Sequence, residues 1–312
     1  MEYGLANLIT ADGERAAIWL PSGYFRLDQL VSARYAENLR SLMDDWIEFQ
    51  TLLPRLVDEC GKLGGLSPAY VAIAGAVLST PIKYPNKLIC VGGVYKDHLL
   101  EFNLPAQRWP KLPMFLRPPS TSLIGPGGQV QVPPRTQQFD WEVELVVVMG
   151  QRLTDGDLKT ARDAIAGYSI GLDLTCRDLL DRASTLGVDL VRAKAQDGMA
   201  PVGPMLVPAD VVGDPQSLRL RLYVNDEIKQ DGSTVDMMYT VYEQIAVVSQ
   251  YITLEPGDIV FTGSPAGSGA SIGQFLKPGD RIRAEIERVG CLEIGIAPTR
   301  KILDVESSLH FV

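Results

Sequence analysis

The chain has 312 residues, of which 46% are hydrophobic and 21% charged, and its formal net charge at pH 7 is -9. This composition predicts a globular protein with one large domain or two smaller ones. The negative charge excludes a broad basic surface, so we expect no nucleic-acid partner and no membrane-surface role.

The start of the chain and the cysteines favour a cytoplasmic protein. Glu2 stands where a secretory signal would carry basic residues. The most apolar later stretch, residues 70–82, is shorter than the roughly 20 residues that a membrane-spanning helix needs. The 4 cysteines lie far apart without paired spacing, as expected of reduced thiols.

The first 80 or so residues differ from the rest. Short strands are predicted in "YGLANLI", "RAAIWLP" and "YFRLDQL", and residues 32–63 then carry apolar side chains at helical spacing. Pro54 is expected to end or kink that helix. The stretch "PIKYPNK", residues 81–87, contains two prolines in a polar setting and is expected to form a boundary. We therefore predict a small N-terminal domain of residues 1–82 and a second domain of residues 83–312.

Short β-type runs separated by Gly/Pro turns dominate the second domain. Two helices are predicted among them, at residues 154–167 with Thr154 as the N-terminal cap, and at residues 237–252. Regular alternation of strands and helices is missing, which indicates a β-rich α+β fold.

Acidic side chains alternate with apolar ones in the first half of the predicted strand "FDWEVELVVVMG", residues 139–150. Alternation along a strand puts Asp140, Glu142 and Glu144 on one face, leading into an apolar run where anions need counter-charges or a cation. A solvated strand face is the alternative. Asp173, in the strand "GYSIGLDLT", would complete a set of oxygen ligands suited to Mg²⁺, Mn²⁺ or Ca²⁺ if it lies near the two glutamates.

Other segments are weaker candidates when taken alone. His98 and Glu101 stand at i, i+3 in "KDHLLE", which on one helical turn brings a carboxylate beside an imidazole and makes a general base. A structural histidine is the alternative. Taken alone, Lys194 in "VRAKAQDG" is more often a surface residue than a functional one, and "VFTGSPAGSG", residues 260–269, is more often a plain turn than a ligand-binding loop.

Taken together and in order, these segments resemble the fumarylacetoacetate hydrolase family. The resemblance covers about residues 86–297 and rests on "ICVGGVYKDHLLEF", "PMFLRPPSTSLIGPGG", "DWEVELVVVMG", "GYSIGLDLTCRDLL", "KAQDGMAPVGPML", "LRLYVNDEIKQDGST" and "LEPGDIVFTGSPAGSG". It implies a β-rich mixed β-roll or sandwich catalytic domain behind a small N-terminal domain. It also implies a homodimer.

The resemblance assigns roles to individual residues. Glu142, Glu144 and Asp173 would hold Mg²⁺ or Mn²⁺, for which Ca²⁺ can substitute in crystals. His98 and Glu101 would form the catalytic dyad, and Lys194 would polarise a substrate oxygen. Substrate contacts would come from Tyr95, Arg117, Arg177, Gln230, Thr262, Gly263 and Ser264. The chain departs from the family pattern at Val94, Arg117 and Gln196, which puts the identity of the substrate in doubt.

The implied activity is metal-dependent hydrolysis of a carbon–carbon bond in a 2,4-diketo acid, an acylpyruvate of the fumarylpyruvate type met in aromatic-compound catabolism. Water activated by the His–Glu dyad would attack the substrate, and the metal would stabilise the enolate that leaves. The family also includes isomerases, such as those of 2-hydroxyhepta-2,4-diene-1,7-dioate, together with decarboxylases and hydratases. A metal-binding scaffold without activity is the non-enzyme alternative.

Overall fold

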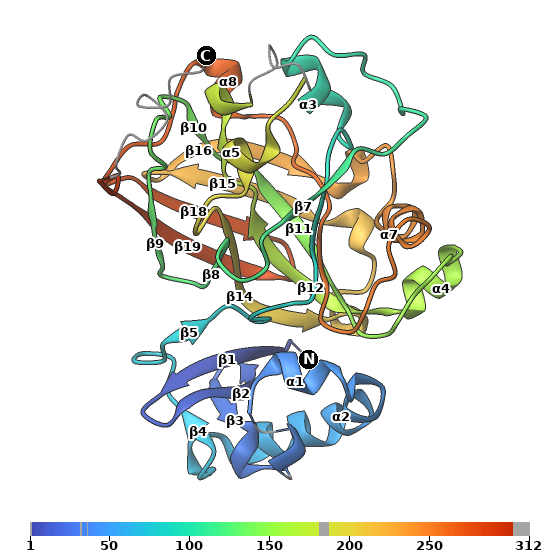
Figure 1. Cartoon of the computed structure of the whole chain (residues 1–312). Helices are drawn as coiled ribbons and strands as arrows, with labels where there is room; N and C mark the ends of the chain where they lie inside the picture. Colours follow the sequence, from blue (N-terminus) through green and yellow to red (C-terminus); the bar gives the residue numbers. More distant parts are fainter. Residues whose placement is uncertain (1, 32, 36, 181–186, 302–312) are drawn as a thin grey trace, which may run out of the picture.

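The computed structural model describes residues 2–31, 33–35, 37–180 and 187–301. Its N-terminal part contains the predicted strands and helical segment, gathered at one end of the molecule (Figure 1). These elements are β1 (Gly4–Thr10), β2 (Gly13–Leu20), β3 (Gly23–Arg26), η1 (Leu27–Gln29), η2 (Ala33–Tyr35), α1 (Leu39–Met43), α2 (Trp46–Leu63), η3 (Gly64–Leu66), β4 (Tyr70–Val71) and β5 (Leu78–Ser79).

The helical segment departs from prediction at its start. Regular helix begins at Leu39 and is divided into α1 and α2, while residues 32 and 36 lie outside the described part. Pro54 lies inside α2 and does not end it, and its exposed position lets water serve the helix carbonyl that a proline leaves without an amide donor. The alternative that Pro54 kinks the helix stays a prediction.

The rest of the described chain forms two further sheets and the continuation of the first. The strands are β6 (Leu88–Val91), β7 (Met114–Arg117), β8 (Leu123–Ile124), β9 (Gln129–Gln131), β10 (Phe139–Asp140), β11 (Val143–Met149), β12 (Ile165–Leu172), β13 (Thr175–Cys176), β14 (Ala200–Pro208), β15 (Arg219–Val224), β16 (Glu227–Ser233), β17 (Ile259–Phe261), β18 (Arg281–Ile286) and β19 (Gly290–Ala297). The helices are α3 (Lys96–Glu101), α4 (Leu158–Asp163), η4 (Arg177–Leu179), α5 (Leu190–Lys194), α6 (Ala209–Val212), η5 (Pro215–Ser217), η6 (Thr234–Asp236), α7 (Val241–Ser249) and α8 (Gly269–Ile272).

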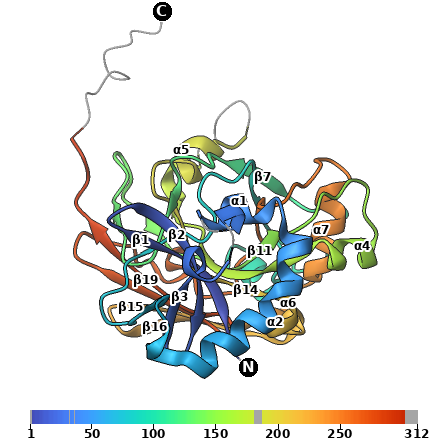
Figure 2. The ribbon, with the colours of Figure 1, turned by 90° about the horizontal axis from the view of Figure 1, so that it is seen from below.

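One large sheet runs through the molecule in the order β4-β3-β2-β1-β14-β12-β11-β17-β6-β7, with β5 added beside β1 and β8 beside β14. A second sheet has the order β16-β15-β18-β19-β9, and β10 pairs with β13. Viewed from the N-terminal side, β1 to β3 and α2 lie in front of the other sheets (Figure 2). The strand-rich α+β architecture predicted from the sequence is confirmed. The division at residue 82 stays a prediction.

Both faces of β11 are buried, which explains its unbroken apolar sequence. Val143, Leu145 and Val147 belong to a core shared with the β15 and β18 strands. Val146 and Val148 belong to a second core shared with α2 and the N-terminal strands. Strand β11, which carries Glu144, is therefore packed against a hydrophobic core on both faces.

Both predicted helices of the second domain form, with different starting points. Helix α4 begins at Leu158, capped by Asp157 in a capping box with Thr160, so the prediction of Thr154 as the cap was wrong. Asp157 is preferred because its carboxylate accepts the Thr160 amide. Helix α7 begins after Thr240. Among the described residues, no helix combines the length and hydrophobicity that crossing a bilayer requires.

Gly171 of β12 is required by packing. A Cβ atom there would lie 2.4 Å from Phe261 Cε1 and 2.5 Å from Val146 Cγ2, far inside normal contact. We expect Gly171→Ala to lower the free energy of unfolding by about 1–3 kcal/mol in urea denaturation, because the fully buried ring and methyl cannot both move aside.

Gly61 of α2 is the matched control, since nothing lies within 4 Å of a Cβ added there. Gly61→Ala should keep or raise the free energy of unfolding, by up to about 1 kcal/mol, because alanine favours a helix. Equal stability of the two variants would contradict the packing account of Gly171.

Candidate active site

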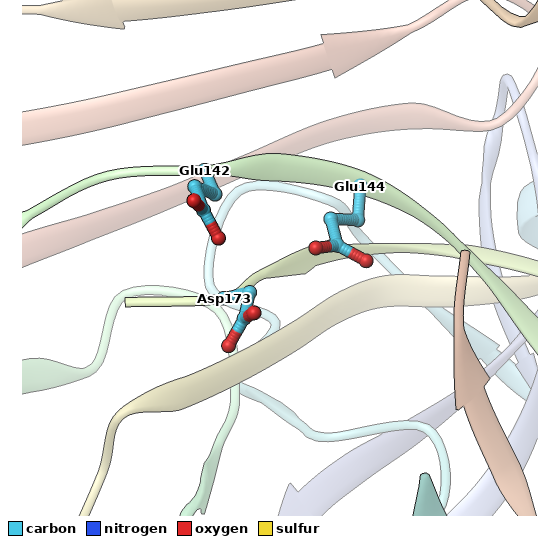
Figure 3. Close-up of side chains that lie close together, drawn as sticks. All are labelled: Glu142, Glu144 and Asp173. Carbon is cyan, nitrogen blue, oxygen red and sulfur yellow. The ribbon is translucent and has the colours of Figure 1, made fainter. Parts of the chain in front are cut away.

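The three predicted metal-binding carboxylates lie together at the ends of two paired strands. Strands β11 and β12 are antiparallel with Glu144 opposite Gly171, and the Glu142 carbonyl accepts the Asp173 amide at 2.9 Å. Glu142, Glu144 and Asp173 each offer a carboxylate oxygen within 4.8 Å of the others, and all three are buried. Figure 3 shows the three side chains side by side. The predicted proximity of Asp173 to the glutamates is confirmed.

The predicted single strand over residues 139–150 is interrupted. Strand β10 ends at Asp140 and β11 begins at Val143, so Glu142 stands in the break between them. Asp140 therefore leaves the face that the alternation assigned to it. Its carboxylate contacts Arg177 and the backbone amides of Gly269 and Ala270.

Lys194, Arg117 and Arg177 neutralise part of the carboxylate cluster. The Lys194 ammonium, at the end of α5, lies 2.8 Å from Glu142 Oε2 and also contacts Asp173 Oδ2. The Arg117 guanidinium contacts Asp173 Oδ1 and donates to the Met199 carbonyl at 2.9 Å. Glu144 accepts the Gly263 amide at 2.6 Å. The predicted counter-charges are present for Glu142 and Asp173, whereas no ion pair with Glu144 is found in the described part of the chain.

The pKa values follow this uneven pairing. Burial, followed by the charge of Glu142, raises the pKa of Glu144 to about 8. Burial also acts to raise the pKa of Glu142, but the charges of Arg177 and Lys194 outweigh it and hold that pKa well below its usual range. Burial lowers the pKa of Lys194 against the pull of Glu142. Burial thus outweighs the nearby positive charges at Glu144, whereas the positive charges outweigh burial at Glu142.

The residues present fit a divalent cation. All three donors are carboxylate oxygens, the hard ligands that Mg²⁺ and Mn²⁺ prefer, and the structure shows no ion pair with Glu144 within the residues it describes. Among the described residues the buried Tyr95 hydroxyl has no hydrogen-bond partner, and burial, followed by the charge of Glu144, raises its pKa well above the usual range. An unpaired buried donor is what a site that receives a ligand leaves open.

The dyad residues lie on α3, above the carboxylates. His98 Nδ1 is 3.0 Å from Glu101 Oε2, and His98 Nε2 is 3.5 Å from Glu142 Oε1. Burial acts to lower the pKa of His98, but the hydrogen bonds with Glu101 and Glu142 outweigh it and raise the pKa to about 9. Engaging Glu142 with a cation would weaken one of these causes. The imidazole is thus oriented by one carboxylate with its other nitrogen facing the cluster.

The predicted substrate loop lies against Glu144. The Thr262 hydroxyl donates to the Leu145 carbonyl at 2.7 Å, which fixes the loop to β11 before Gly263 donates its amide to Glu144. Gly263 has a φ of +88°, and a Cβ there would meet Val94 Cβ at 3.1 Å, so glycine is needed for this approach.

Gln230 connects the same loop to the start of β11. Its amide nitrogen donates to Ser264 Oγ at 2.9 Å and to the Pro265 carbonyl at 2.8 Å, while its oxygen accepts the Val143 amide at 2.8 Å. This side chain is 1% exposed. Its predicted contact with substrate stays a prediction, as does that of Ser264.

The remaining predicted residues lie around the carboxylates. Arg177 donates to Glu142 Oε1 at 2.5 Å and to Asp140 Oδ2 at 2.8 Å. Arg117 has no exposed side-chain surface and lies behind Asp173. The predicted roles of Arg177, Arg117 and Tyr95 toward a substrate are untested and stay predictions.

The sequence placed Asp140 on the acidic face of a strand and predicted no contact for it. It also predicted no contact between Glu101 and the residues Gly267 and Ser268. The Gly267 amide donates to Glu101 Oε1 at 2.6 Å, and Ser268 Oγ lies 3.3 Å from Glu101 Oε2. The run of small residues after "TGSP" is the only signal for this contact, and it reads equally well as a plain turn.

Three carboxylates on paired strands beside an oriented histidine form an arrangement suited to binding a divalent metal. The model of the fumarylacetoacetate (FAA) hydrolase C-terminal domain matches residues 87–297, and the chain belongs to this family. It is 38% identical over 214 residues to the human protein named oxaloacetate tautomerase FAHD2B, mitochondrial, an alignment that covers 68% of this chain and 67% of that one.

Two solved structures of other proteins are also similar to this chain. A fumarylpyruvate hydrolase from Pseudomonas aeruginosa in complex with Mn²⁺ and pyruvate is 30% identical, with a TM-score of 0.63 over 70% of this chain and 91% of that one. A 2-hydroxyhepta-2,4-diene-1,7-dioate isomerase from Mycobacterium marinum is 26% identical, with a TM-score of 0.71 over 96% of this chain and 100% of that one. The family predicted from the sequence is confirmed.

Proposed function

We propose that this protein is a divalent-metal-dependent hydrolase that cleaves the carbon–carbon bond of a 2,4-diketo acid, an acylpyruvate. The observation that carries the proposal is the orientation of His98, whose Nδ1 is held by Glu101 while Nε2 faces the carboxylate cluster. A base aimed at the place where a chelated substrate would lie is what activation of a water molecule requires. The similarity to a hydrolase solved with Mn²⁺ and pyruvate supports the same reaction.

Each residue of the dyad has a distinct task in this reaction. Glu101 fixes the tautomer and orientation of the imidazole, and His98 Nε2 takes a proton from water. The hydroxide attacks the C4 carbonyl, and the C3–C4 bond then breaks to leave a carboxylic acid and the enolate of pyruvate. His98 returns the proton to C3 of that enolate.

Negative charge develops on the 2-oxo oxygen of the substrate as the C3–C4 bond breaks. The carboxylate cluster would serve this step by holding a cation near that oxygen. Glu142, Glu144 and Asp173 would hold Mg²⁺ or Mn²⁺, which when bound supplies positive charge to that oxygen. The Lys194 ammonium, held beside Glu142 and Asp173, adds a second positive group from the protein itself. This stabilisation matters because it grows toward the transition state.

Oxaloacetate tautomerisation is a second candidate, favoured by the 38% identity to a protein of that name. It needs the same chelating cluster and the same base, but His98 would move a proton between the enol oxygen and C3 without activating water. Isomerisation, decarboxylation and hydration of related acids use the same cluster. The homodimeric state, the cytoplasmic location and a place in aromatic catabolism remain our proposals.

Product analysis distinguishes the candidates. Purified protein with Mn²⁺ is given acylpyruvates of increasing acyl size, and pyruvate release is followed with lactate dehydrogenase and NADH. Decay of the oxaloacetate enol absorbance is followed in parallel. Pyruvate release supports the hydrolase, enol decay alone would replace it with the tautomerase, and silence in every assay would favour a metal-binding scaffold.

A further inference from the structure

The Asp140 carboxylate is fully buried and lies outside the three-carboxylate cluster. Its Oδ1 accepts the amides of Trp141 and Gly269, both at 2.7 Å. Its Oδ2 accepts the Ala270 amide at 3.1 Å and the Arg177 Nε at 2.8 Å. Four donors converge on one side chain, so its position is fixed closely.

On one side, Asp140 reaches the predicted metal ligand Glu142. Arg177 donates Nε to Asp140 and Nη2 to Glu142 Oε1, the latter at 2.5 Å. The same Glu142 oxygen lies 3.5 Å from His98 Nε2. Because a guanidinium is planar and rigid, holding Nε of Arg177 on Asp140 also fixes the direction in which Nη2 points toward Glu142.

On the other side, Asp140 reaches the dyad carboxylate. The loop that it anchors at Gly269 begins two residues earlier with the Gly267 amide and the Ser268 hydroxyl, which hold the two oxygens of Glu101. Gly267 has a φ of +104°, and a Cβ there would lie 2.1 Å from the Lys229 carbonyl, so the loop keeps this shape only with glycine.

We propose that Asp140 is a positioning residue that sets Glu142 and the His98–Glu101 dyad in register with each other. The contacts close a ring that runs through His98, Glu101, the loop Gly267–Ala270, Asp140, Arg177 and Glu142 and back to His98. The assignment of His98 as the base rests on the proposed function, whereas the ring of contacts does not. Displacing Asp140 should disturb the metal ligand and the base together.

Asp140→Asn tests the ring with little change of volume. In either orientation of the new amide, its NH₂ group faces two of the four donors. The donors that lose their acceptor are then either the Trp141 and Gly269 amides or the Ala270 amide and Arg177 Nε, so the loop or Arg177 shifts. We expect kcat to fall about 10- to 100-fold with a smaller change in KM, and the Mn²⁺ Kd to rise about 10-fold.

A direct view of the dyad comes from the histidine ring signals. The chain has only 2 histidines, so labelled protein gives few ring resonances, and the His98 signal is the one lost in His98→Asn. Asp140→Asn should shift the His98 ring resonance. Ser268→Ala, which removes a contact on the Glu101 side alone, should shift it and lower kcat while leaving the Mn²⁺ Kd unchanged.

Asp258→Asn is the matched control. Asp258 is also fully buried, accepts the amides of Lys87 at 2.8 Å and Glu255 at 2.7 Å, and pairs with Lys87 Nζ at 2.9 Å, but it contacts no member of the ring. It should lower Tm as much as Asp140→Asn does and leave kcat, the Mn²⁺ Kd and the His98 resonance as in the wild type.

The proposal is overturned if Asp140→Asn only lowers Tm, as the control does. It is overturned equally if kcat falls while the Mn²⁺ Kd stays at the wild-type value, because Glu142 would then keep its position without Asp140. It is also overturned if Ser268→Ala weakens Mn²⁺ binding, because the loop would then affect the metal site by a route other than Asp140. The Mn²⁺ titration and the histidine spectrum need no substrate. A failure of the proposed hydrolase reaction would therefore leave this test intact.

Discussion

Replacing Glu144 with glutamine should abolish Mn²⁺-dependent turnover and leave the fold intact. Burial already raises the pKa of Glu144 to about 8, so in the metal-free protein at pH 7 this side chain is mostly neutral. The Gly263 amide, its hydrogen-bond partner among the described residues, can donate equally to a glutamine oxygen. The metal-free variant should therefore have the wild-type Tm at pH 7, and a higher Tm above pH 8, where only the wild type carries a buried charge. Loss of a direct ligand should weaken Mn²⁺ binding by more than about 100-fold, beyond the cost of losing an outer partner.

Asp173→Asn is the contrasting variant. It also removes a ligand, but it leaves the buried Arg117 and Lys194 without their shared anion. We expect a loss of about 3–5 kcal/mol in the free energy of unfolding, the usual cost of breaking a buried pair. Titration calorimetry with Mn²⁺ and urea denaturation of both variants measure the two effects. Full Mn²⁺ affinity in Glu144→Gln would contradict the assignment of this residue as a ligand.

His98→Asn should lower kcat by about 10²- to 10⁴-fold, the range that loss of a general base produces. The Mn²⁺ Kd should stay near the wild-type value, because His98 lies beside Glu142 without belonging to the carboxylate cluster. Steady-state kinetics with an acylpyruvate and a parallel Mn²⁺ titration measure both quantities.

Glu101→Gln provides the comparison for His98. The imidazole remains but loses the carboxylate that orients it, so the loss in kcat should be smaller, about 10- to 100-fold. If His98→Asn keeps wild-type turnover, the histidine is structural. If it loses Mn²⁺ binding instead, His98 belongs to the metal site and another group must serve as the base.

Local patterns in the sequence predicted the parts of the site that local geometry builds. The spacing of His98 and Glu101 is enough to bring them together, since both stand on one helical turn. Glu142 and Glu144 still lie together although Glu142 stands one residue before the start of β11, because its carbonyl keeps the pairing with the Asp173 amide. The place of Asp173 needed more, namely the antiparallel pairing of β11 with β12.

Long-range packing determined what the sequence did not predict. Asp140 turns away from the glutamates because Gly269, Ala270 and Arg177, all distant in sequence, offer it donors. Lys194 pairs with Glu142 and Asp173 only because α5 lies beside them in the fold. Neither the periodicity nor the residue propensities of a single sequence predict contacts between residues that are far apart in the chain.

Chelation of the metal tests the central claim most directly. Protein treated with EDTA and freed of it by gel filtration is assayed for pyruvate release from an acylpyruvate, and Mn²⁺ or Mg²⁺ is then added back. We predict that hydrolysis disappears after chelation and returns with either cation, and that Glu144→Gln does not recover under the same additions. Hydrolysis at the wild-type rate in the chelated protein would contradict the account.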